Sequence, residues 1–400
     1  NAANSGTGLI NETLINTSTE PVTVAYVYTL TANSCSNIQT VNVVVNPTPQ
    51  LTSTLTPTAV CNGDAFVYTP LSSSSTAVIT WTRPVAAGIS NAAATGTGVI
   101  NETLNNTTTT PKTVHYAIEM NVGGCIETED VAVVINPLLL LTSPTSRNVC
   151  DSALLEYLPV SNISGATITW TRPAVTGLSN PAGSGTGNIA ERLYDTTVSP
   201  VTVNYTYTLS AFGCSKDHTL AVTVKPRPKL TTSLTPGAVC TNSLFNYVAA
   251  SATAGTTFQW ARDTVVGITN PTVHVLNGTI NEILISTSDT ILNVPYKFTS
   301  TAGGCSNAQI VNVKVNPLPR IANDSGNVAV CDSTLLSWVP TSKTPGATYA
   351  WSRAYEAGIS NLPASGTGGA PGERLNNTTY ITVPVTYVYT ITANGCSNTQ

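Results

Sequence analysis

A segment of about 90 residues recurs along this 400-residue chain, and the repeat constrains the fold more than any other feature of the sequence. A Trp-x-Arg tripeptide begins at Trp81, Trp170, Trp260 and Trp351, at spacings of 89, 90 and 91 residues. A Gly-Ile/Leu-Ser/Thr-Asn motif follows each tripeptide, and a Gly-Thr-Gly motif recurs with it in most copies. The chain is therefore predicted to be a tandem array of similar units, each long enough to form one domain.

Proline marks the boundary between consecutive copies. Each boundary follows an alternating, valine-rich segment, and two prolines within three residues favour an extended, semi-rigid linker. The boundary motifs are Asn46-Pro47-Thr48-Pro49, Asn136-Pro137, Lys225-Pro226-Arg227-Pro228 and Asn316-Pro317-Leu318-Pro319. The predicted units are 1–46, the C-terminal half of a repeat; 47–136, 137–225 and 226–316, three complete repeats; and 317–400, a repeat that lacks its last strand.

Within each unit, residues alternate with the period of two that is typical of β-strands. Val24, Tyr26, Tyr28 and Leu30, for example, share one face of an expected strand. Turn-forming residues separate such segments about every ten residues, and no helical spacing is convincing. About seven short strands in about 90 residues predict an all-β chain made of tandem immunoglobulin-like antiparallel β-sandwiches.

Composition excludes several classes of function. Only 9% of the residues are charged, the net charge is -4, and no basic stripe is present, so we expect neither nucleic acid nor an anionic membrane as a partner. No apolar run approaches the roughly 18 residues needed for membrane insertion. The sequence has no Gly-x-Ser-x-Gly nucleophile motif and no recurring histidine, so we expect no enzyme activity, no catalytic residue and no cofactor.

The order of motifs within a unit resembles a known family. The residues that carry the likeness are Ala59-Val-Cys61-Asn-Gly63, Trp81-Thr-Arg-Pro84, Val114-x-Tyr116, Gly124-Cys125 and Val131-x-Val133-x-x-Asn136-Pro137. This set is similar to the PKD-like and Ig-like tandem repeats of giant Bacteroidetes cell-surface proteins, over the whole chain. The resemblance implies export by the type IX secretion system and a place at the cell surface or in an extracellular filament, as in gliding-motility adhesins.

The function expected from these features is that of a structural repeat region in a large secreted surface adhesin or filament, which acts as a stiff rod or spacer. At about 3.3 Å per strand residue, four and a half sandwiches would span about 150 Å. Two alternatives are repeats that bind a ligand or carbohydrate, and the stalk of a surface polysaccharide-degrading enzyme. Nearly identical loops from unit to unit favour the spacer. The expected partners are further copies of the same repeat in the parent chain, with lateral self-association in a filament and surface glycans as two further options.

Nine cysteines occupy two positions per unit, a regularity that indicates disulfides formed in an oxidising compartment. Zinc is the competing explanation, but the sequence has no Cys-x-x-Cys motif, and its histidines fall at unrelated positions of the repeat. Cys61, Cys150, Cys240 and Cys331 precede the second expected strand, whereas Cys35, Cys125, Cys214, Cys305 and Cys396 lie in the final hairpin.

Counting cysteines leaves two pairing schemes open. Pairing across each linker, which begins with Cys35 and Cys61, leaves Cys396 alone. Pairing within each unit leaves Cys35 alone and gives every unit its own staple, worth about 4 kcal/mol in the chain-entropy model. We favour the second scheme, although its two cysteines could lie at opposite ends of a sandwich. Its pairs are Cys61 with Cys125, Cys150 with Cys214, Cys240 with Cys305 and Cys331 with Cys396.

An arginine and a glutamate recur about 20 residues apart in a chain that has few charges. We expect a buried or half-buried ion pair beside the core tryptophan of each unit. Calcium binding by the glutamate is the alternative, but no acidic cluster accompanies it. The pairs are Arg83 with Glu102, Arg172 with Glu191, Arg262 with Glu282 and Arg353 with Glu373. The Gly-Thr-Gly motif is interpreted as a tight bend, because a phosphate-binding loop would need a helix after it.

Five aspartates are followed by Ser or Thr and then by an apolar residue or Thr. This pattern is similar to the O-glycosylation signal of Bacteroidetes surface proteins, and the structural alternative is that Asp-Ser and Asp-Thr begin turns. A rod with so few charges would gain solubility from hydrated glycans. The candidate glycosylation sites are Ser152, Thr196, Thr264, Thr290 and Ser333.

Overall fold

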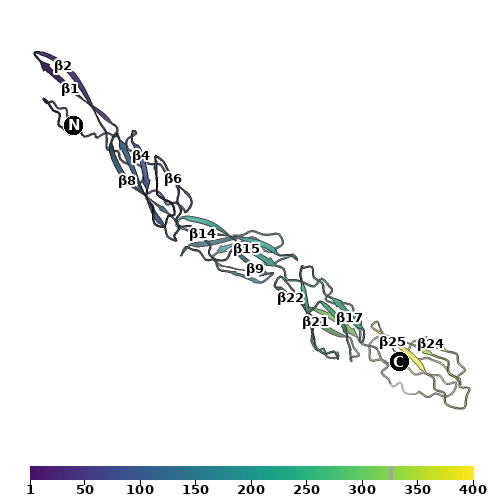
Figure 1. Ribbon diagram of the computed structural model, residues 1–400. Helices are drawn as coiled ribbons and strands as arrows, with labels where there is room; N and C mark the ends of the chain where they lie inside the picture. The colour runs from purple at the N-terminus through teal and green to yellow at the C-terminus, as the bar shows by residue number, and fades with distance from the viewer. Residues whose placement is uncertain (324–327) are drawn as a thin grey trace.

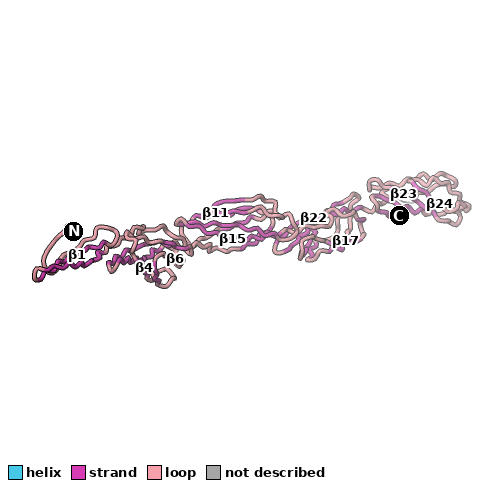
Figure 2. The backbone as a smooth tube through the Cα atoms, turned by 90° about the horizontal axis from the view of Figure 1, so that it is seen from above, coloured by secondary structure: helices cyan, strands magenta, loops and turns pink. Residues whose placement is uncertain are grey.

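The computed structural model describes residues 1–323 and 328–400 as a long rod of β-sandwiches joined end to end (Figure 1 and Figure 2). The described residues form β-strands joined by turns and loops and contain no helix. Consequently, this part of the chain offers no helix with the length and apolar character that crossing a membrane requires.

Unit 137–225 shows the topology that the other complete units share. A five-stranded sheet has the order β12-β11-β14-β15-β9, and a two-stranded sheet of β10 and β13 faces it. Neighbouring strands are antiparallel except β9, which pairs in parallel with the end of β15. This is an immunoglobulin-like sandwich, so the predicted fold class is confirmed. The strands are β9 (Ser146–Cys150), β10 (Leu154–Tyr157), β11 (Thr167–Arg172), β12 (Gly183–Thr186), β13 (Ile189–Arg192), β14 (Val201–Ala211) and β15 (Cys214–Lys225).

The other units repeat this arrangement with local differences. Residues 1–46 contain β1 (Val22–Ala32) and β2 (Cys35–Val45). Unit 47–136 contains β3 (Ala65–Tyr68), β4 (Val78–Arg83), β5 (Ala94–Thr97), β6 (Ile100–Thr103), β7 (Lys112–Val122) and β8 (Cys125–Ile135). Unit 226–316 contains β16 (Val239–Cys240), β17 (Leu244–Val248), β18 (Thr257–Arg262), β19 (Val273–Val275), β20 (Thr279–Ile283), β21 (Leu292–Ala302) and β22 (Cys305–Asn316). Residues 317–400 contain β23 (Thr348–Arg353), β24 (Ala364–Thr367), β25 (Tyr387–Ala393) and β26 (Cys396–Thr399).

The core of each unit lies between its two sheets and is supplied by the alternating residues of the long hairpin strands. In β14 and β15, Val203, Tyr205 and Val222 are fully buried, and the residues between them face outward. β-Branched and aromatic side chains favour this pleated, half-buried setting. Burying each one stabilises the fold by about 1.5–3 kcal/mol before the entropy of ordering the chain is counted.

Residues 1–46 form a single hairpin of β1 and β2. Positions that face the core in a complete unit are exposed here. Leu30 is 57% exposed whereas its counterpart Met120 is fully buried, and Val41 is 50% exposed whereas Val131 is fully buried. The difference arises because the hairpin lacks a facing sheet among the described residues.

The linkers are packed against the units they join. The last strand of a complete unit ends one or two residues before the boundary proline, and Pro137, Pro226 and Pro317 are all buried. The side chain of His218 in β15 contacts the linker carbonyl of Leu139 at 3.0 Å. Since little free chain separates the units, bending at a linker would disturb packed side chains.

Candidate functional site

The tip of each long hairpin lies at the junction with the preceding unit. Asn136, at the end of one unit, donates from Nδ2 to the carbonyl of Phe212 in the next hairpin at 2.9 Å. Asn316 makes the equivalent bond to the carbonyl of Asn394 at 2.7 Å. The final cysteine of each unit follows this tip directly, so it lies at the N-terminal end of its own sandwich.

The first cysteine of each unit lies at the opposite end of the sandwich. Val149 and Cys150 of β9 pair in parallel with the last residues of β15, where Cys150 is opposite Lys225. Cys240 is placed in the same way beside Asn316. This parallel pairing carries the first cysteine to the C-terminal end of its unit, next to the following hairpin tip.

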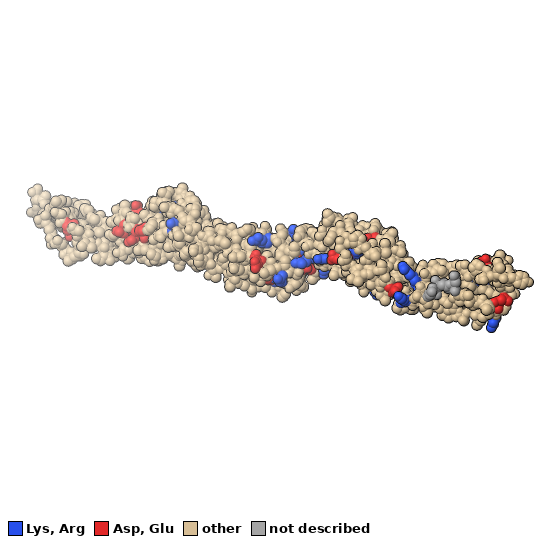
Figure 3. Space-filling view, turned by 90° about the horizontal axis from the view of Figure 1, so that it is seen from below, with Lys and Arg blue, Asp and Glu red and all other residues tan. Residues whose placement is uncertain are grey.

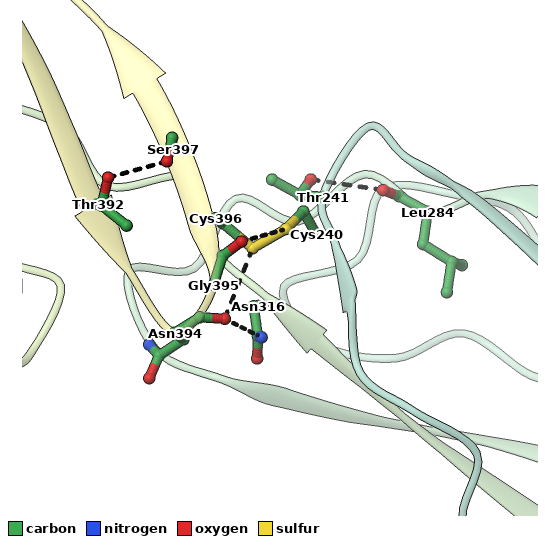
Figure 4. Close-up of a disulfide and its surroundings, with 9 residues drawn as sticks. All are labelled: Cys240, Thr241, Leu284, Asn316, Thr392, Asn394, Gly395, Cys396 and Ser397. Atoms are coloured by element: carbon green, nitrogen blue, oxygen red, sulfur yellow. Dashed lines mark hydrogen bonds between the residues drawn. A yellow bond between two sulfur atoms is a disulfide. The ribbon is translucent and has the colours of Figure 1, made fainter.

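Three disulfides consequently cross three junctions, each joining the first cysteine of one unit to the last cysteine of the next. Their Cα–Cα distances are 5.6 to 5.7 Å, within the usual range for disulfides. Figure 4 shows one of them between Cys240 and Cys396, beside the hydrogen bond from Asn316 to Asn394. The three bonds are Cys61–Cys214, Cys150–Cys305 and Cys240–Cys396.

The predicted pairing within each unit is therefore wrong. In unit 137–225, Cys150 and Cys214 lie at opposite ends of the 12-residue strand β15, which at about 3.3 Å per residue places them about 35 Å apart. A disulfide allows a Cα–Cα distance of at most about 7 Å. The other scheme, which begins with Cys35 and Cys61, is also wrong, because Cys61 is bonded to Cys214 and Cys35 is a free thiol.

Two of the cysteines expected in disulfides, Cys125 and Cys331, are free thiols, and Cys35 is a third. These cysteines still occupy the two cysteine positions of the repeat. Cys125 has the hairpin position of Cys214, and Cys331 has the position of Cys150. The surroundings of Cys125 match those of a junction disulfide, because Asn46 donates to the carbonyl of Gly123 at 3.0 Å.

Each recurring arginine lies beside its glutamate. Arg83 donates from Nε and Nη2 to the two carboxylate oxygens of Glu102 at 2.8 and 2.9 Å, and Nη2 also donates to the carbonyl of Ala92 at 2.6 Å. The arginine side chains are 1–3% exposed and the glutamates 15–22%. The bidentate pairs are Arg83–Glu102, Arg172–Glu191, Arg262–Glu282 and Arg353–Glu373.

A tyrosine completes each of these clusters, and the sequence reasoning missed it. Tyr116 donates to Glu102 at 2.7 Å, and Tyr205, Tyr296 and Tyr387 donate to the glutamates of their own units. A tyrosine recurs 14 residues after every glutamate, so this offset was the available signal. Because Arg and Tyr belong to one sheet and Glu to the other in unit 47–136, the cluster joins the two layers of the sandwich.

The electrostatics of the cluster suit a structural role. The pKa of Tyr116 is raised well above its usual range, mainly by burial and next by the hydrogen bond to Glu102. Hydrogen bonding from Arg353 lowers the pKa of Glu373 against the opposing effect of burial. The glutamate thus stays ionised and the tyrosine stays protonated at neutral pH, so neither is prepared to exchange a proton.

The Gly-Thr-Gly motif combines two requirements, of which the sequence reasoning identified one. Gly187 has a φ of +63°, which fits the predicted tight bend. Gly185 instead lies against Trp170, and a Cβ atom there would lie 2.8 Å from the indole ring. The first glycine is therefore a packing requirement of the core tryptophan.

The five candidate glycosylation sites all lie in turns or loops. Ser152 and Ser333 have φ values of +59° and +58°, and the preceding aspartates accept backbone hydrogen bonds at 2.9 and 2.7 Å. The donors are the backbone amides of Asp195 and Asn377, 44 and 45 residues away, so these two aspartates bond to a distant loop of the same unit. Asp195 is the one that begins a local turn, because it accepts from the backbone amide of Thr197 at 2.7 Å. Thr196 donates to the carbonyl of Gly177 at 3.0 Å. Thr264 and Thr290 are exposed, and within the described residues the side chains of the aspartates before them make no hydrogen bond to the protein.

Two open hollows lie on the described surface. One of about 470 Å³ in unit 317–400 is lined mainly by threonine, and one of about 640 Å³ in unit 226–316 lies between residues 235–238 and the strands β21 and β22. Among the described residues, no three His, Cys, Asp or Glu side chains lie close enough together to hold a metal ion. Charged side chains are sparse on the face drawn in Figure 3.

No protein-family model matches the chain, and no curated protein matches it. Solved structures give weak matches. Titin domains I67–I69 align with a TM-score of 0.31 and 13% identity over 67% of this chain and 98% of that one. The insect immune protein hemolin aligns with a TM-score of 0.24 and 10% identity, over 88% of this chain and 97% of that one. Drosophila N-cadherin EC1-4 aligns with a TM-score of 0.24 and 9% identity, over 75% of this chain and 84% of that one. Scores this low carry no inference about function, and the fold assignment stands on the strand pairing.

Proposed function

We propose that this chain is the structural repeat region of a large secreted surface protein and acts as a stiff extracellular rod or spacer. The observation that carries the proposal is the disulfide at each of three successive junctions, Cys61–Cys214, Cys150–Cys305 and Cys240–Cys396. Two covalent connections between neighbouring units, the linker and the disulfide, oppose both bending and twisting. Junctions of this kind would keep the rod in one shape.

An oxidising, extracellular location follows from the same bonds. Disulfides persist outside the cytosol, and three of them connect successive units here. The motif resemblance extends the proposal to a Bacteroidetes-type surface adhesin or filament of the gliding-motility kind, exported by type IX secretion, with further copies of the repeat as its neighbours in the parent chain. The proposed role involves no catalysis.

The loops favour a spacer over repeats that recognise a ligand. The Gly-Ile/Leu-Ser/Thr-Asn loop takes the same conformation in the units because its asparagine bonds the same strand end each time. Asn91 donates to the carbonyl of Thr103 at 2.9 Å, and Asn361 donates to that of Arg374 at 2.9 Å. Loops that select ligands would be expected to vary while the strands stay similar.

Small-angle X-ray scattering of the oxidised chain tests the rod. A rod of about 150 Å has a radius of gyration of about 43 Å, whereas a compact chain of this length has about 21 Å. We expect a value above about 40 Å, and antibody labelling of intact source cells should place the repeat outside the membrane. A radius of gyration near the compact value, or a protein found only in the cytosol, would contradict the proposal.

A further inference from the structure

We propose that the junction disulfides make the rod inextensible under tension, an inference that rests on the proposed function as a rod and deepens it. The disulfides have sequence separations of 153, 155 and 156 residues, whereas the repeat is about 90 residues long. Successive disulfide loops must therefore overlap. Residues 150–214 lie within the first two loops, and residues 240–305 lie within the last two.

The overlap creates two covalent tracks along the rod. The first track crosses from Cys61 to Cys214, follows β15 and the next linker to Cys240, and crosses to Cys396. The second track follows β8 and its linker to Cys150, crosses to Cys305, and continues along β22. Each track runs through the last strand of one unit and then through the first segment of the next.

The two tracks run side by side and in the same direction within a unit. In unit 137–225, β15 belongs to the first track and β9 to the second, and the two strands pair in parallel from Ala221–Ser146 to Lys225–Cys150. The remaining strands of the sandwich, β10 to β14, lie between Cys150 and Cys214 and belong to neither track. Tension applied to the ends of the rod is carried by the tracks and does not unravel those strands.

The available extension is small because the load-bearing segment is short. The shortest covalent path between the two ends, here called the taut route, bears the load first. From Cys61 to Cys396 it contains only residues 214–240 and two disulfides, each with a Cα–Cα distance of 5.7 Å. Residues 230–239 lie beside residues 309–315 of β22, so their nine steps cover the length of six strand residues. The segment therefore spans about 75 Å in the folded rod and about 95 Å when fully stretched. The gain is on the order of 20 Å, whereas one unravelled unit of about 90 residues would gain about 270 Å.

The free cysteines occupy positions that would continue both tracks. Cys35 lies at the start of β2 and would continue the first track beyond Cys61. Cys125 and Cys331 would continue the second track at its two ends, and the hairpin tip at Cys125 has the same asparagine contact as a junction disulfide. Copies of the repeat on either side would supply the partner cysteine to each. The design is therefore one that can be repeated along a longer array without a break in either track.

Single-molecule stretching of the 400-residue chain between terminal protein tags tests the proposal. The parent chain carries Cys35→Ser, Cys125→Ser and Cys331→Ser, so that no free thiol can exchange with a disulfide. Apart from the release of residues 1–46, which all variants share, we expect no step of unit length under oxidising conditions. After reduction we expect steps of about 270 Å. Unit-length steps in the oxidised chain would overturn the proposal.

Two double variants, each lacking one disulfide, separate the track model from general stabilisation. Cys150→Ser with Cys305→Ser leaves the first track intact, so the stretched length should not change. Cys240→Ser with Cys396→Ser forces the taut route back to Cys150 and across to Cys305, which adds roughly 130 residues, or about 450 Å. Equal lengthening in the two variants would refute the tracks, because stabilisation alone would make the two bonds equivalent.

Limited proteolysis gives a second readout that needs no variant. A single backbone cut anywhere between Cys61 and Cys396 leaves the chain covalently joined, because at least one disulfide spans every position in that interval. Nicked protein should remain full-length on a non-reducing gel and separate only after reduction. Fragments on the non-reducing gel would contradict the connectivity. The oxidised chain could show unit-length steps in stretching and still have the radius of gyration of a rod. That result would refute the track model and would not contradict the proposed function as a rod.

Discussion

Replacing Glu282 by Gln should destabilise unit 226–316 by about 2–3 kcal/mol. The guanidinium of Arg262 is 1% exposed and donates to both carboxylate oxygens of Glu282, at 2.9 and 3.0 Å. Removing one partner of a buried ion pair costs about 3–5 kcal/mol. The expected cost is smaller here because Gln keeps one acceptor and Arg262 also donates to the carbonyl of Pro271 at 2.6 Å. For a domain of this size the loss corresponds to a fall in Tm of about 10–20 °C.

Native-state hydrogen exchange with mass spectrometry can measure this loss in one unit of the array. Peptides from β21 and β22 should lose protection equivalent to about 2–3 kcal/mol, while peptides from β14 and β15 in the neighbouring unit should change little. Glu119→Gln on β7 is the matched control, because its exposed position on the outer face of the strand predicts a change within about 0.5 kcal/mol. A loss no larger than that of the control would refute the reasoning that the buried guanidinium depends on its carboxylate.

Three further predictions concern the core, acid stability and glycosylation. Gly185→Ala should cost about 1–3 kcal/mol in unit 137–225, measured by the same exchange experiment, because the added methyl group meets the ring of Trp170 at 2.8 Å; an unchanged stability would contradict the packing argument. The lowered pKa of Glu373 means that its contribution to stability is present above about pH 4.5 and is lost as the pH falls through the folded-state pKa; thermal melts of residues 317–400 that stay flat from pH 5 to pH 3 would contradict this sign. In protein from its native cell surface, mass spectrometry should find glycans first at Thr264 and Thr290, where the preceding aspartates bond no protein group among the described residues; unmodified peptides at both sites would end that idea.

The sequence by itself determined the repeat, the strand character and the ion pairs. Alternation with a period of two specifies which face of a strand is buried, and this is a local property of the chain. The Arg83–Glu102 pair was predictable because each member recurs in a sequence with few charges. The tyrosine partner recurs just as regularly, but tyrosine is a usual core residue, so its hydroxyl contact with the glutamate was not distinguished from ordinary packing.

Only the tertiary structure decided which cysteines pair. The cysteine pattern is equally regular whether Cys150 pairs within its own unit or with the next one, because every unit carries the same two positions. The choice depends on the parallel pairing of β9 with β15, which carries Cys150 to the far end of its sandwich and beside the next hairpin tip. Parallel pairing is a long-range contact that leaves no local pattern in the sequence, so the junction disulfides and the covalent tracks they form became apparent only once the strands were placed in space.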